Sequence, residues 1–126
     1  MNRIIDIARM EIGVVESPPD SNCVKYNDWF YGKPTMGKSY PWCATFVSWV
    51  FNKAGYPLPN MGYRKGFAGC DTAYNYFKTH NEIIDPVMAQ PGDIVIYDWN
   101  GDGHTDHVGI FFRGIGKGQS VKLSIV

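Results

Sequence analysis

The sequence predicts an α+β fold in which N-terminal helices pack on an antiparallel β-sheet. Two observations predict it. Apolar residues recur at helical spacing before Pro86, whereas β-branched runs and glycine-rich turns follow it. Helices followed by strands, without regular alternation, are typical of α+β proteins and weigh against a parallel α/β sheet.

Four segments have helical patterns. In the first, apolar side chains recur at helical spacing, and Gly13 ends the pattern. In the third, Pro41 suits a first helical position and Gly55 suits a C-terminal cap. The aromatic-rich loop Ser17–Ser39 between them is expected to line a groove. The expected helices are Asn2–Ile12, with the apolar positions Ile4, Ile5, Ala8, Ile12 and Val15, then Tyr26–Phe30, the segment bounded by Pro41 and Gly55, and Asp71–Thr79.

Three segments have strand patterns. The turn signal Pro91-Gly92-Asp93 precedes the β-branched run Ile94–Tyr97. His107–Phe112 and Val121–Val126 are the second and third expected strands. The glycine-rich segment Gly114–Gly118 lies between them, which predicts that these two strands pair as a hairpin.

Length and charge exclude several classes of protein. A chain of 126 residues suits one domain, and its 12 basic residues balance 12 acidic ones. No overall field therefore favours nucleic acid or a membrane surface as the partner. Charged residues interrupt the segment Met1–Ile12, unlike a signal peptide, and no run of about 18 apolar residues predicts a membrane span. We expect a single-domain monomer that is made in the cytoplasm.

Cys43 is the candidate nucleophile. It lies in the first turn of the third expected helix, where the helix dipole and free N–H groups favour the reactive thiolate. His107, at the start of a strand, is the candidate base, which would take the thiol proton and pass it to a leaving amine. A buried structural cysteine is the alternative for Cys43. His80, at the polar end of a helix, is interpreted as a C-terminal cap.

The other two cysteines, Cys23 and Cys70, have no CxxC spacing, which weighs against a zinc site or a thioredoxin-type couple. We interpret them as free thiols on small buried side chains. A disulfide between Cys23 and Cys70 stays open as the alternative, although no framework of further cysteines accompanies it.

Three ordered motifs resemble those of one known family. They are Tyr40-Pro41-Trp42-Cys43-Ala44, Pro91-Gly92-Asp93-Ile94-Val95 and Asp106-His107-Val108-Gly109-Ile110. With them the chain closely resembles the CHAP family, the cysteine- and histidine-dependent amidohydrolases and peptidases of phage endolysins and bacterial wall-remodelling enzymes. Ile12-Gly13, Glu16-Ser17-Pro18 and Lys25-Tyr26-Asn27 are similar to the N-terminal part of endolysin-type members.

The resemblance implies a papain-like fold and hydrolysis of an amide bond in bacterial peptidoglycan. The bond is either the N-acetylmuramoyl-L-alanine amide or a peptide bond of the stem peptide or cross-bridge. Cys43 would be the nucleophile, with its backbone N–H in the oxyanion hole, and His107 the general base. Trp42 and Trp99, next to the motifs, are expected to flank the substrate. The protein would reach the wall through a phage holin or as part of a larger secreted protein.

One departure from the family concerns the residue that orients the histidine. The family usually places Glu, Asp or Asn on the strand after the histidine strand, but nothing acidic follows His107 here. Val121–Val126 resembles that strand. We therefore expect a domain truncated at its C-terminal end, with the orienting residue beyond Val126, and an activity that is reduced or absent without it.

The loop before His107 resembles a calcium-binding loop. Oxygen-bearing side chains stand at positions one, three, five and nine, Gly103 permits the sharp turn, and a main-chain carbonyl would fill position seven. Gly109 occupies position twelve, where a bidentate acid is usual, and a solvated Asx and glycine turn is the alternative. We predict a structural Ca²⁺ and no cofactor for the chemistry itself. The predicted ligands are Asp98, Asn100, Asp102, His104 and Asp106.

Three other functions stay open. An NlpC-type cell-wall peptidase shares the cysteine helix and the histidine strand, but usually has Asp-Cys-Ser where this chain has Trp42-Cys43-Ala44. A transglutaminase-like transfer to an amine would use the same dyad. A catalytically silent wall-binding module is the third alternative, given the missing orienting residue.

Overall fold

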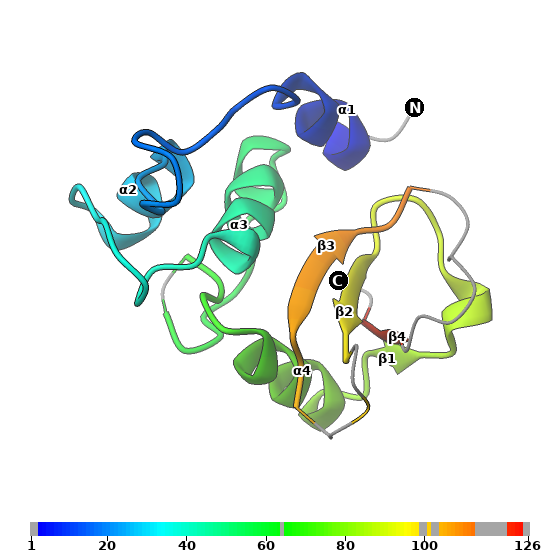
Figure 1. Cartoon of the computed structure of the whole chain (residues 1–126). Helices are drawn as coiled ribbons and strands as arrows, with labels where there is room; N and C mark the ends of the chain where they lie inside the picture. Colours follow the sequence, from blue (N-terminus) through cyan, green and yellow to red (C-terminus); the bar gives the residue numbers. More distant parts are fainter. Residues whose placement is uncertain (1–2, 64, 99–100, 102–103, 113–120, 125–126) are drawn as a thin grey trace.

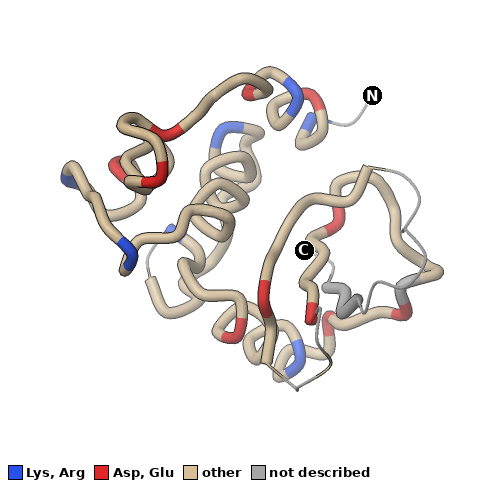
Figure 2. The backbone as a smooth tube through the Cα atoms, in the orientation of Figure 1, with Lys and Arg blue, Asp and Glu red and all other residues tan. Residues whose placement is uncertain are grey.

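The α-helices precede the strands along the chain, which confirms the predicted α+β class (Figure 1). The computed structural model describes residues 3–63, 65–98, 101, 104–112 and 121–124. None of the helices in this part of the chain is long and apolar enough to cross a membrane. Basic and acidic positions are interspersed along the helices (Figure 2). The helices are α1 (Arg3–Met10), α2 (Lys25–Tyr31), α3 (Cys43–Lys53), α4 (Cys70–Thr79) and the 3-10 turn η1 (Pro86–Met88), and the strands are β1 (Ile83–Ile84), β2 (Ile94–Tyr97), β3 (His107–Ile110) and β4 (Val121–Ser124).

The strands form an antiparallel sheet in the order β1-β4-β2-β3. The predicted hairpin between the last two strands is wrong, because β4 pairs with β2, with Val121 opposite Tyr97, on the far side of β2 from β3. The side chains of Ile94–Ile96 are all buried, so β2 is covered on both faces and takes a central place with a partner at each edge. Gly114–Gly118 lies outside the described residues.

Two elements are shorter than their patterns. The first helix ends before Ile12 and Val15, which are 83% and 74% exposed although the pattern assigned them to the apolar face. Gly13 adopts a left-handed φ of +101°, so the chain turns away from the core there. Strand β3 stops at Ile110 and leaves Phe112 partly exposed beyond it.

One apolar core joins α3 and α4 to the sheet. Its side chains come from both helices and from β2 and β3, and burial of each large one contributes about 1.5 to 3 kcal/mol. This packing sets α3 alongside β3 (Figure 1). The core residues of these four elements, each at most 2% exposed, are Ala44, Val47, Phe51, Ala73, Phe77, Ile94, Ile96 and Val108.

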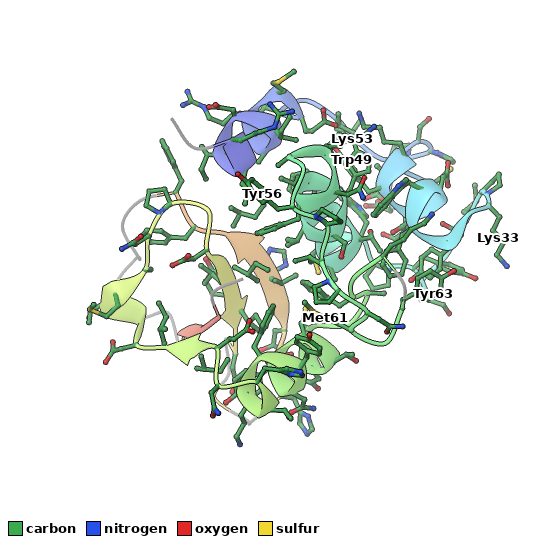
Figure 3. All side chains as sticks on the ribbon, turned by 180° about the vertical axis from the view of Figure 1, so that it is seen from behind. Lys33, Trp49, Lys53, Tyr56, Met61 and Tyr63 are labelled. Atoms are coloured by element: carbon green, nitrogen blue, oxygen red, sulfur yellow. The ribbon has the colours of Figure 1, made fainter. Side chains whose placement is uncertain are left out.

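A second apolar cluster lies on the side of α3 that α1 and α2 cover (Figure 1). Trp49 belongs to it and lies near Lys53 at one end of α3 (Figure 3), with the Lys53 Nζ 5.6 Å from the ring centre. Lys25 of α2 places its Nζ 4.8 Å from the same ring. Each such cation–π contact is worth about 0.5 to 1 kcal/mol at an exposed site, and the second one links α2 to α3.

The C-terminal end of α3 is closed by its own backbone. Ala54 caps the helix, and Gly55 follows it with a left-handed φ of +88°. This turn lets the Tyr56 N–H donate to the Phe51 carbonyl at 2.9 Å. The predicted stop at Gly55 therefore has a clear backbone cause.

The N-terminal end of α3 is held by Asn27 of α2, whose side chain is fully buried. Its Nδ2 donates to the carbonyl oxygens of Asn22 at 3.1 Å and Tyr40 at 2.8 Å. Its Oδ1 accepts the Thr45 hydroxyl, in the first turn of α3, at 2.5 Å. One amide therefore fixes a loop, the approach to the helix and the helix start relative to one another.

Replacing Asn27 with Ala is expected to lower the free energy of unfolding by about 3 kcal/mol, because two carbonyls and a hydroxyl lose a buried partner. Urea denaturation measures the loss. Asn52→Ala, at an exposed position of α3, is the matched control and should change stability by less than about 0.5 kcal/mol. Equal losses in the two variants would contradict the role of Asn27.

Candidate active site

A cleft of about 500 Å³ opens between the start of α3 and the start of β3. Helix α3 packs alongside β3, and the first residues of the two elements line the same cleft. These residues are Cys43 and His107, the two that the sequence nominates for catalysis. The cleft is lined by Asn22, Pro41, Trp42, Cys43, Phe46, Asp106, His107, Val108 and Gly109.

Cys43 is half-buried at the very start of α3. The N-cap residue, Trp42, makes no side-chain cap hydrogen bond, so its side chain does not compete for the N–H groups of the first turn. Helical bonding begins here, with the Phe46 N–H donating to the Trp42 carbonyl at 2.9 Å. The free N–H groups and the helix dipole favour negative charge at Cys43.

His107 begins β3 and lies opposite Tyr97 of β2. The two rings stack, with centres 5.9 Å apart and planes inclined by 28°. Cys43 and His107 line the same cleft, and His107 lowers the pKa of Cys43. The imidazole is therefore supported by an aromatic ring and lies beside the nucleophile.

The surroundings of Cys43 favour its thiolate. A hydrogen bond with the Cys70 thiol lowers the pKa of Cys43 most, and the hydrogen bond and charge of His107 lower it further. The Val108 backbone N–H adds a smaller effect in the same direction, while partial burial opposes all three. The pKa of Cys43 lies well below that of an ordinary thiol, so the sulfur is ionised near neutral pH.

The contribution of Cys70 is not predicted by the sequence. Cys70 is the first residue of α4, and both it and Cys23 are free, half-buried thiols, so the two do not form a disulfide. The hydrogen bond to Cys43 raises the pKa of Cys70, which stays a protonated donor beside the thiolate. The contact depends on α3 and α4 packing on one core, which spacing along the chain does not reveal.

The CHAP domain family model matches residues 35–124, a range that includes both Cys43 and His107. The chain belongs to the CHAP domain family. It is also similar to the probable endopeptidase p60 of Listeria welshimeri, with 33% identity over 95 residues, which cover 68% of this chain and 15% of that protein. The chain thus spans about 15% of the length of this relative. No solved structure gives a significant match.

Membership of the CHAP family confirms the resemblance and defines the chemistry in outline. The family is one of cysteine-dependent amidases and peptidases that act on peptidoglycan. The matched range begins before the cysteine motif and ends in β4, so it covers the cleft apart from Asn22.

Trp42 of the CHAP domain lines the cleft and also belongs to the second apolar cluster. Its ring stacks on Tyr26, with centres 5.6 Å apart, so the cleft wall is anchored in the core. Trp99 lies outside the described residues. His80 is the C-cap of α4, and its Nδ1 lies 2.8 Å from the Tyr76 carbonyl, which confirms the predicted cap.

The predicted calcium ligands are described only in part. Asp98 is buried, Asp106 lines the cleft and His104 lies on the surface. Among the residues that the structure describes, no group of three His, Cys, Asp or Glu side chains could hold a metal ion. The calcium site stays a prediction, since two of its residues, Asn100 and Asp102, lie outside the described part of the chain.

Asn22 is a cleft residue that the sequence does not single out. Its backbone has a left-handed φ of +60°, and its Nδ2 donates to the Gly37 carbonyl at 2.8 Å. Its backbone N–H donates to the Glu16 carboxylate. The loop Ser17–Ser39 is expected to line a groove, but an Asn in a turn-rich loop carries no signal of its own.

The alkylation rate of Cys43 by iodoacetamide is expected to rise with pH through a midpoint well below the ordinary thiol pKa of about 8.5. The lowered pKa of Cys43 is the cause, since the thiol is protonated and slow below that pKa and ionised above it. Mass spectrometry of the tryptic peptide 39–53, which contains Cys43 as its single cysteine, measures the rate. Unfolding the chain in urea should return the midpoint to the ordinary value, and an unchanged midpoint would contradict the assignment.

Proposed function

We propose that this domain hydrolyses an amide bond of bacterial peptidoglycan, with Cys43 as the nucleophile, His107 as the general base and acid, and a papain-like arrangement of helix and sheet. The observation that carries the proposal is that these two side chains line one open cleft, where His107 lowers the pKa of Cys43. A structural cysteine buried among apolar groups would instead have a raised pKa. CHAP membership independently supports the same pair.

The reaction starts from the Cys43 thiolate and the His107 imidazolium. The sulfur attacks the carbonyl carbon of the amide, and the carbonyl oxygen takes up the electron pair. As the C–N bond breaks, His107 donates its proton to the leaving nitrogen, and a thioester remains on Cys43. Neutral His107 then removes a proton from water, whose oxygen attacks the thioester. Release of the carboxylic acid restores the thiolate and the imidazolium.

The start of α3 is proposed to stabilise the oxyanion as well. The Cys43 backbone N–H lies at the helix N-terminus, where donors and dipole both favour negative oxygen. Trp42 and Phe46 supply an apolar wall next to this point, which suits the small apolar side chains of a peptide. Trp99 stays proposed as a second flank.

The bond is proposed to be a peptide bond of the stem peptide or cross-bridge. The support is the similarity of this chain to a protein named as a probable endopeptidase. The N-acetylmuramoyl-L-alanine amide is the alternative. Mass spectrometry of the released fragments separates the two, because an amidase frees intact stem peptides from the glycan whereas an endopeptidase creates a new terminus within the peptides.

Cys43→Ala is expected to slow the clearing of purified cell walls on the order of 1,000-fold or more, because the thioester can no longer form. His107→Ala should be similarly slow. Cys23→Ala is the matched control and should clear walls at the wild-type rate. Equal clearing by wild type and Cys43→Ala would contradict hydrolysis, whereas wall binding without clearing by the wild type would identify a silent binding module.

We also propose that the loop from Asp98 to Asp106 binds a structural Ca²⁺ that steadies His107. Besides the residue pattern, the support is the position of Asp106, which lines the cleft next to His107. Excess chelator is expected to lower the melting temperature by about 5 °C, and added Ca²⁺ should restore it. Asp102→Ala should remove the response and Asp85→Ala should keep it. A wild-type transition that ignores the chelator would count against the site.

A further inference from the structure

The first two residues of α4 contact the two halves of the dyad from one helix end. Cys70 packs against the same apolar core as Cys43 and lowers the pKa of that thiol, and its neighbour Asp71 binds the loop that leads into His107. Helix α4 carries neither member of the dyad, but it packs on the same apolar core through Ala73. A third element therefore touches both sides of the site.

Asp71 holds this loop through a single carboxylate. Its Oδ1 accepts the Thr105 backbone N–H at 2.8 Å and the Thr105 hydroxyl at 2.5 Å. Its Oδ2 lies 3.5 Å from the Nδ1 of His104. The next residue, Asp106, donates its N–H to a carbonyl of β2 at 2.7 Å, and His107 follows. The backbone is thus fixed at two consecutive residues just before the base.

The Asp71 carboxylate is more than half exposed, and one of its oxygens accepts both bonds from Thr105. Exposure makes each bond weak for stability. Their effect is therefore expected on the position of the loop more than on the fold.

Cys70 acts on the sulfur itself. It is half-buried and packs against the main core, so the fold holds its thiol beside Cys43. The His107 side chain and the Val108 N–H, both from β3, also lower the pKa of Cys43. Asp106 lines the same cleft. No step of the proposed hydrolysis uses Cys70 as an acid, base or nucleophile.

We propose that Cys70 and Asp71 together set the geometry and charge of the dyad. Cys70 is a donor that stabilises the attacking thiolate by direct contact, and Asp71 is a positioning residue that fixes the approach to His107. The proposal rests on the proposed function and adds two residues to its machinery. Because both are supplied by the same helix end, the ionised sulfur and the base are aligned by one rigid element.

The pH profile of Cys43 alkylation tests Cys70. In Cys70→Ala the midpoint is expected to rise by about one pH unit, which is a tenfold loss of thiolate below the midpoint. In Cys70→Ser a hydroxyl donor remains, and most of the wild-type midpoint should return. Cys23→Ala is the matched cysteine control and should leave the profile unchanged. An unmoved midpoint in Cys70→Ala, or an equal rise in Cys70→Ser, would overturn the role of Cys70.

Wall hydrolysis at varied wall concentration tests Asp71. Asp71→Ala is expected to lower the maximal rate about tenfold with little change in the half-saturating concentration, because a displaced base slows the chemistry and leaves binding intact. Asp71→Asn keeps the oxygen that accepts both Thr105 bonds, so its maximal rate should lie within about threefold of the wild-type rate. Asp85→Ala removes an exposed aspartate that also accepts a backbone N–H, and serves as the control.

An unchanged maximal rate in Asp71→Ala, or the same loss in Asp85→Ala, would overturn the role of Asp71. Melting curves of each variant confirm that the compared proteins are folded. The alkylation experiment does not depend on wall hydrolysis, so it tests the role of Cys70 separately from the proposed function. Equal clearing by wild type and Cys43→Ala would contradict the proposed function. If the wild type clears walls but the Cys70 and Asp71 variants keep the wild-type alkylation profile and maximal rate, only the present proposal is contradicted.

Discussion

Burial of the inner face of α3 against β2 and β3 is the constraint on which the rest of the structure depends. Val47 of the helix and Val108 of the strand leave water only when the two elements lie side by side. The two elements begin at the same end of this packing, so the first residue of the helix and the first residue of the strand share a cleft. The chemistry of the site is thus a geometric result of apolar packing, and the weaker polar contacts refine it.

The two thiols of the site have opposite ionisation states, and the charges around them explain the division. Donors reach Cys43 from α4 and β3, so negative charge gathers on this sulfur. The hydrogen bond to Cys43, burial and the nearby carboxylates Asp71 and Asp106 all oppose ionisation of Cys70. Acidic residues close to a thiol raise its pKa and disfavour the thiolate. Here Asp71 and Asp106 raise the pKa of Cys70, which therefore stays protonated and can donate.

Local sequence patterns predict the residues of this site but not all of the contacts between them. Pro41 and Gly55 mark the two ends of α3, so the place of Cys43 in its first turn follows from sequence. The apolar run after His107 likewise makes it the first residue of a strand. Both residues belong to motifs whose family is confirmed over residues 35–124. Their contact with Cys70 depends on how α4 packs, and no spacing along the chain encodes that.

The pairing of β4 is predicted wrongly for a similar reason. A glycine-rich connection favours pairing between sequence neighbours, so the hairpin is the natural prediction for β3 and β4. Strand β2, in which Ile94–Ile96 are all buried, competes for the same partner, and it pairs with both strands. Burial of this central strand outweighs a local turn preference, and only the assembled sheet shows which pairing forms.

The buried amide of Asn27 has a consequence for how this cleft can change. Its partners belong to the cleft wall at Asn22, the chain entering α3 and the helix's first turn at Thr45. Wall and nucleophile are therefore tied to one side chain, and mutations at either should show strong epistasis. Variation in substrate preference among descendants of this sequence is then expected to concentrate elsewhere, at cleft positions such as Gly109, where an added side chain meets no neighbouring atom within 4 Å.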